Sequence, residues 1–154
     1  MTSLAMSDSP ADEKKAFSLM AAVGANMDRL RQCINALCQL HDRWKDSSGV
    51  SINLIAQLTA LRSNLGEMQD WMKYAISDTH PQLLSDLDLL MTSCSLMIRN
   101  LDDLLGQLRQ PDHDKTDWAV KLKFSVGSRS MTRLRSVAKR QTDAVSLLLA
   151  ACKW

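Results

Sequence analysis

The sequence predicts an all-α protein, an up-and-down antiparallel four-helix bundle with a short extra helix before the last long one. The chain has 154 residues and is 45% hydrophobic, which is enough for one compact core. It contains only five Gly and three Pro, too few to build the many turns of a β protein. Apolar residues that recur every three or four positions, separated by turn-forming residues, then locate the helices.

The first helix is expected to begin at Pro10, a favoured first helical residue that follows a suitable N-cap, Ser9. Its apolar seam leads on to His41 and Trp44 and consists of Met20, Val23, Met27, Leu30, Ile34 and Leu37. The turn-forming residues 46–49 should end this helix.

Two further helices are separated by Pro81, which disfavours helix in the residue before it and suits the start of the next one. The stripe of the second helix is Leu54, Leu58, Leu61, Leu65, Met68, Met72 and Ala75. The stripe of the third helix is Leu84, Leu87, Met91, Cys94, Ile98, Leu101, Leu105 and Leu108. Apolar residues flank both stripes, so we expect these helices to touch more than one neighbour. Residues 111–114 should end the third helix.

The last stretch should begin near Thr116, a suitable N-cap, and run to the C-terminus. Gly127 and its neighbouring serines are expected to divide it into a short helix at 117–126 and a longer one. The seam of the longer helix is Met131, Leu134, Ala138, Gln141, Val145, Leu148 and Cys152.

Short connections should make consecutive helices antiparallel neighbours in one bundle. A long coiled-coil dimer is the alternative, but broad stripes fit a strict two-stranded seam poorly. We expect residues 1–9 to be a flexible N-terminus and 10–153 a single helical-bundle domain, which could be the N-terminal part of a larger protein.

Basic residues are concentrated toward the C-terminus. Between Lys115 and Arg140 there are eight of them against a single acidic residue, Asp117, although the whole chain carries only +2. The candidate surface for a partner or an anionic lipid is Lys121, Lys123, Arg129, Arg133, Arg135, Lys139 and Arg140. The alternative is a solvated face that balances acidic residues on a neighbouring helix. Nucleic acid is less favoured, because the stretch has few aromatics and no motif that reads DNA.

No catalytic or cofactor-binding pattern is present. The chain has no Gly-rich phosphate loop, no GxSxG and no HExxH, and Glu occurs only twice, too rarely for a di-iron bundle. His41, Cys38 and Cys94 could be considered as metal ligands, but neither a CxxC pair nor a second close histidine accompanies them. We therefore expect a protein without enzymatic activity, metal, cofactor or small-molecule substrate.

The expected location is cytoplasmic, with peripheral contact to a membrane as a further option. The sequence starts without a basic and then apolar leader, and it has no run of about 18 apolar residues. Four cysteines within apolar helical patterns fit reduced thiols.

Three segments resemble the N-terminal helical domain of fungal signalling proteins, over about 37–152 of the chain. They are LHDRWKDSSGVSINLIAQLTALRSNL at 40–65, LLSDLDLLMTSCSLMIRNLDDLLGQL at 83–108 and RQTDAVSLLLAAC at 140–152. That family precedes STAND (NLR-like) ATPases, ankyrin arrays and modules similar to G-protein α subunits. It is related to the HeLo and HeLo-like domains of heterokaryon incompatibility and regulated cell death.

The resemblance implies a non-enzymatic signalling or adaptor domain that acts through self-association or protein partner binding. The alternative that it implies is a membrane-active HeLo-like cell-death effector, which would bind anionic lipid through the basic C-terminal helix. Here the N-terminus is polar and acidic through Lys15. This argues against insertion of an apolar N-terminal helix into a membrane and favours peripheral binding.

Overall fold

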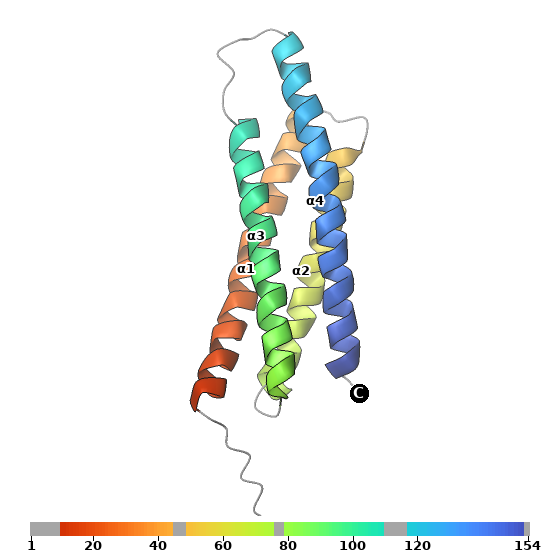
Figure 1. Ribbon diagram of the computed structural model, residues 1–154. Helices are drawn as coiled ribbons and strands as arrows, with labels where there is room; N and C mark the ends of the chain where they lie inside the picture. The colour runs from red at the N-terminus through yellow and green to blue at the C-terminus, as the bar shows by residue number, and fades with distance from the viewer. Residues whose placement is uncertain (1–9, 45–48, 76–78, 110–116, 153–154) are drawn as a thin grey trace, which may run out of the picture.

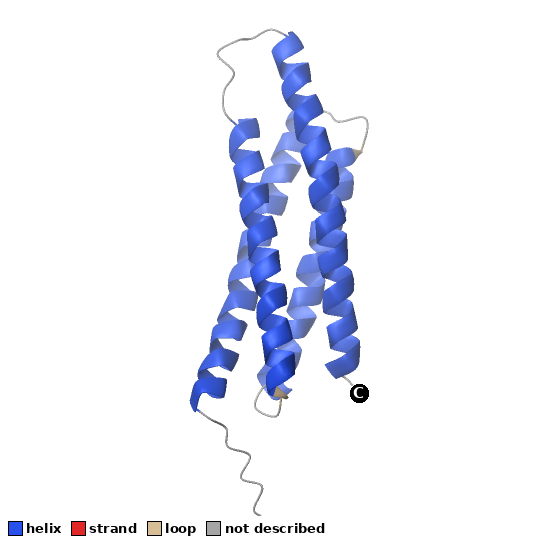
Figure 2. Ribbon diagram, viewed as in Figure 1, coloured by secondary structure: helices blue, strands red, loops and turns tan. Residues whose placement is uncertain are grey.

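The computed structural model describes residues 10–44, 49–75, 79–109 and 117–152. They form four long helices, α1 (Pro10–Trp44), α2 (Val50–Ala75), α3 (Pro81–Arg109) and α4 (Asp117–Cys152), which run alternately up and down (Figure 1). All regular structure in these ranges is helical (Figure 2). The predicted four-helix bundle is confirmed. Residues 1–9, the caps Ser9 and Thr116 and the turn residues 46–48 and 111–114 lie outside the described ranges.

Backbone geometry and hydrogen bonds at Gly49 and His80 explain where α2 and α3 begin. Gly49 adopts a φ of 74°, and its carbonyl oxygen accepts the first hydrogen bond of α2 from the Asn53 amide at 2.9 Å. His80 caps α3, because its Nδ1 accepts a hydrogen bond from the Gln82 amide at 3.1 Å and its carbonyl accepts one from Leu83 at 3.0 Å. Pro81 then occupies the first helical position, as predicted.

The order of the helices around the bundle differs from the expected one. α1 lies next to α2 and α3, and α4 lies next to α2 and α3, whereas the backbones of the described parts of α2 and α3 do not come close to each other. α2 and α3 therefore occupy opposite corners of the bundle (Figure 1). As a result, α1 lies parallel to α3 and α2 lies parallel to α4.

Several polar contacts join helices that are not consecutive in the chain. On α2, Asn64 Nδ2 donates to the Ser146 hydroxyl of α4 at 2.6 Å and to the Thr142 carbonyl at 3.2 Å. On α1, Asn26 Nδ2 donates to the Met91 carbonyl of α3 at 3.2 Å. These hydrogen bonds stabilise the α2–α4 and α1–α3 contacts of this order.

The core contains the predicted stripes of α2 and α3 almost complete. All eight predicted residues of α3 are buried, and six of the seven in α2, Ala75 being only partly covered. In α1 the buried face is rotated from the predicted seam. Met20, Met27 and Ile34 are partly covered, and the core also contains Leu19, Asn26, Cys33, Ala36 and Leu40. The reason is that α1 packs on α2 with one flank and on α3 with the other.

The predicted break at Gly127 is wrong, since α4 continues without interruption from Asp117 to Cys152 and includes the expected short helix. Gly127 is buried against Leu108 of α3: a Cβ added there would lie 3.0 Å from Leu108 Cδ2. This glycine permits close packing of two helices and does not end one. Further along α4 the predicted seam is buried as far as Val145, after which Leu149 rather than Leu148 enters the core.

Candidate partner-binding surface

The predicted basic residues of α4 lie on its outward face. Arg129, Arg133, Arg135, Lys139 and Arg140 are all exposed, and Lys121 and Lys123 lie on the part of α4 whose side chains are not described. Helical periodicity divides the five into two rows. We call Arg129, Arg133 and Arg140 the α3-side row, because Arg133 lines a hollow against α3. Arg135 and Lys139 form the α2-side row, on the flank where Thr142 and Ser146 meet α2.

None of these five cations pairs with a carboxylate in the described part of the chain. The ion pairs found there join Arg29 to Asp102 at 3.4 Å, Arg31 to Asp28 at 3.4 Å and Lys73 to Asp70 at 3.6 Å. The alternative of a face that balances acidic residues on a neighbouring helix therefore gains no support from ion pairs. The basic face is open to an external ligand.

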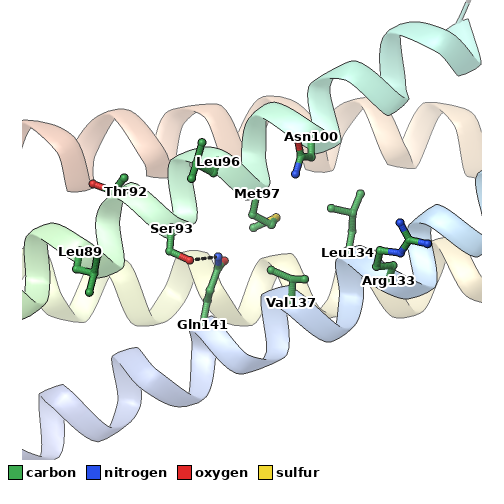
Figure 3. Close-up of a pocket in the computed structure, with 10 residues that line it drawn as sticks. All are labelled: Leu89, Thr92, Ser93, Leu96, Met97, Asn100, Arg133, Leu134, Val137 and Gln141. Atoms are coloured by element: carbon green, nitrogen blue, oxygen red, sulfur yellow. Dashed lines mark hydrogen bonds between the residues drawn. The ribbon is translucent and has the colours of Figure 1, made fainter.

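A hollow of about 510 Å³ opens between α3 and α4 (Figure 3). Its apolar lining comes from both helices and consists of Leu89, Leu96, Met97, Leu134 and Val137. Leu89 is 72% exposed and Leu96 is 52% exposed, although both are large apolar residues. Since they are seven positions apart on one helix, they belong to the same face of α3. We call this hollow and its rim the α3–α4 groove.

Polar side chains interrupt the apolar lining, and they are Thr92, Ser93, Asn100, Arg133 and Gln141. Gln141 is 4% exposed, and its Nε2 donates to the Ser93 hydroxyl at 3.1 Å, as drawn in Figure 3. Its Oε1 is buried and accepts no hydrogen bond from the described residues. A buried acceptor without a donor costs about 1–3 kcal/mol of stability. The groove therefore contains a polar group that would gain from a donor.

More side-chain hydrogen bonds join α2 to α4 and α1 to α3. α2 and α4 share three hydrogen bonds, two from Asn64 and one from Gln57 Nε2 to the Thr142 hydroxyl at 3.1 Å. Across the described ranges, the bond between Gln141 and Ser93 is the one side-chain hydrogen bond between α3 and α4. The α3–α4 contact thus combines few polar ties with a hollow.

The residues considered as metal ligands do not come together. His41 Nδ1 lies 2.8 Å from the Ser51 hydroxyl and links the end of α1 to the start of α2. Cys38 is exposed, while Cys94 is buried in the core. Within the ranges that the structure describes, no three His, Cys, Asp or Glu side chains are placed to hold a metal ion.

The buried thiols are poor nucleophiles. Burial raises the pKa of Cys94 to about 12. Burial also raises the pKa of Cys33 to about 12, and its hydrogen bond to Asp102 at 3.1 Å adds to this effect. Both groups stay protonated at neutral pH, and a thiolate is the reactive form.

Two further findings concern membrane-spanning segments and similarity to known proteins. Along the described helices, no segment has both the length and the apolar character needed to cross a membrane. A comparison of the chain with protein-family models, curated proteins and solved structures gives no match.

Proposed function

We propose that this chain is a non-enzymatic helical adaptor domain that binds a partner protein through the α3–α4 groove. The observation that carries the proposal is the groove itself, where an apolar hollow meets two leucines that stand largely in solvent. Exposed apolar surface next to a hollow is typical of a site that another molecule covers. The exposed polar side chains of Ser93 and Asn100 add groups in the lining that a partner could hydrogen-bond.

The resemblance to the fungal HeLo-like domains supports the same role, a signalling domain joined to STAND (NLR-like) or related modules. We propose a cytoplasmic location on the same grounds, supported by four cysteines that are free in the structure. In this proposal the bundle is a rigid support, and the groove is the part that recognises a partner.

The second candidate function is binding to an anionic membrane surface through the outward face of α4. It is favoured by a separate observation, the two rows of exposed cations without carboxylate partners. Each Lys or Arg near an anionic surface contributes about 1 kcal/mol of binding free energy at low salt. Membrane binding should use both rows, whereas docking in the groove should use the α3-side row alone.

Site-directed photo-cross-linking tests the proposed function in the cells that express the chain. A photoreactive p-benzoylphenylalanine replaces Leu96 in the groove, and in a matched control it replaces Ile52, a half-exposed aliphatic residue of α2. We expect a covalent protein adduct from position 96 and none from position 52. Adducts to lipid at position 96 would favour the membrane function. Equal adducts at both positions, or none, would contradict a docking groove.

A vesicle experiment separates the two functions. Vesicles that contain phosphatidylserine are sedimented with the wild-type chain, with Arg135→Glu/Lys139→Glu and with Arg133→Glu/Arg140→Glu. If the chain is an adaptor, little of any of the three should sediment at physiological salt. Strong sedimentation of the wild type that both double substitutions abolish would establish the membrane function instead.

A further inference from the structure

We infer that the occupant of the α3–α4 groove is an amphipathic helix of a partner protein with carboxylates along one flank. This inference rests on the proposed function, because it names the chemistry of the partner at the same site. It follows from the shape of the groove, the charge beside it and the polar groups within it.

The groove has the shape that accepts a helix. On α3 its rim runs from Leu89 to Leu96, roughly 10 Å along the helix, and on α4 its lining runs from Arg133 to Gln141, roughly 12 Å. A third helix laid between two antiparallel helices places anchors at every third or fourth position into such a hollow. About three turns of a ligand helix would cover the apolar lining and both exposed leucines.

The charge beside the groove favours acidic residues on that helix. Arg133 lines the hollow, and the α3-side row continues with Arg129 one turn away and Arg140 two turns away. All three guanidinium groups are free of described carboxylates. Asp or Glu residues at one-turn and two-turn spacing on the ligand helix would meet this row, with the bidentate geometry that Arg and carboxylate allow.

The same charges argue against a second copy of the chain as the occupant. A symmetric dimer through this groove would place the α3-side rows of both copies at one interface, where like charges repel. An acyl chain fits poorly for a different reason. It would cover the exposed polar side chains of Ser93 and Asn100 without offering a hydrogen bond, and burying such groups unpaired is costly. A helix can present Asn, Gln or Ser to these two residues.

The test is a displayed library of amphipathic helices of about 18 residues, long enough for about five turns. A leucine stripe is fixed at i, i+3/i+4 and i+7 spacing, while the flanking and central positions are random. The library is first depleted on the Leu96→Glu variant and then selected on the wild-type chain. Leu96 is half exposed, so this variant should remain folded, which circular dichroism and a thermal melt check.

We expect the selected helices to carry Asp or Glu on one flank and a hydrogen-bond donor near the centre. A selected peptide should bind Arg133→Glu about tenfold or more weakly than the wild type. Changing its facing Glu to Lys should restore the affinity for Arg133→Glu and weaken that for the wild type. Ile52→Glu, which adds the same charge to α2, should leave binding unchanged.

Selected helices without an acidic flank, or no helix that depends on Leu96, would overturn the inference. If the selected helices depend on Leu96 but lack an acidic flank, only the inference about the partner's charge fails, and the groove remains the docking site of the proposed function. If no helix binds at all and vesicles capture the chain through both rows, the proposed adaptor function fails with it.

Discussion

Replacing Gln141 with methionine should stabilise the bundle, although it removes a hydrogen bond. Methionine is unbranched and similar in length, so it should follow the path of the glutamine side chain through the same space. The change removes a buried acceptor that lacks a donor, worth about 1–3 kcal/mol. It also removes the bond to Ser93, worth about 0.5–1.5 kcal/mol, but the Ser93 hydroxyl is exposed and can bind water instead. The net expectation is a gain of about 1 kcal/mol.

Urea denaturation followed by circular dichroism measures this gain as a higher midpoint with an unchanged slope. Ser93→Ala is the matched control, because it leaves the Nε2 of Gln141 without a partner as well. We expect that variant to lose about 1 kcal/mol. If Gln141→Met were less stable than the wild type by more than about 1 kcal/mol, the Oε1 would have a partner such as buried water. The reasoning that the groove needs a donor would then be refuted.

Three further predictions concern the core and its pH dependence. Leu101 is fully buried, so Leu101→Ala should lower the free energy of unfolding by about 2–5 kcal/mol, measured by denaturation. Leu101→Asp should abolish the cooperative thermal transition, because it buries a charge. An unchanged melting temperature would show that Leu101 does not belong to the core. Gly106→Ala should raise the free energy of unfolding by about 0.5–1 kcal/mol, because Gly106 is exposed within a helix and an added Cβ would have nothing within 4 Å. Gly127→Ala should raise it less, because the added Cβ would crowd Leu108. Equal gains would show that α3 and α4 are less closely packed at Gly127. Burial raises the pKa of Cys94 from 9.0 to about 12, so the contribution of the buried thiol to stability is complete below pH 9 and is lost as pH rises toward 12. Cys94→Ala should therefore flatten the decline of stability between these pH values. A variant with the same pH profile as the wild type would contradict this prediction.

The helices could be predicted from the sequence where an apolar stripe lies between residues that start or end a helix. α3 is the best example, because Pro81 marks its start and all eight residues of its predicted stripe are buried. α1 was predicted less well, since Asn26 and Cys33 reach the core through polar contacts that a hydrophobic pattern does not contain. The break predicted at Gly127 was wrong, because the local sequence does not distinguish a glycine that allows close helix packing from a glycine that ends a helix.

The order of the helices could not be predicted, because an apolar stripe does not specify which other helix covers it. The basic residues of α4 were predicted as a candidate surface, and the structure shows five of them exposed. The α3–α4 groove was not predicted, as it exists only once α3 and α4 are neighbours. Two signals pointed to it: Gln141 in an apolar seam, and Leu89 and Leu96 seven positions apart but off the seam of α3.

The arrangement of polar contacts explains why this side of the bundle can accept a partner. Hydrogen bonds from Asn64 hold α4 to α2, and those from Asn26 and Arg29 hold α3 to α1. The bundle thus consists of two parallel pairs, and α3 and α4 belong to different pairs. A ligand helix in the groove would contact the boundary between these pairs, which the described side-chain hydrogen bonds of Gln141 with Ser93 and of His41 with Ser51 join. Binding at this site would therefore leave intact the contacts that fix each pair, which is the condition for adding a helix without unfolding the support.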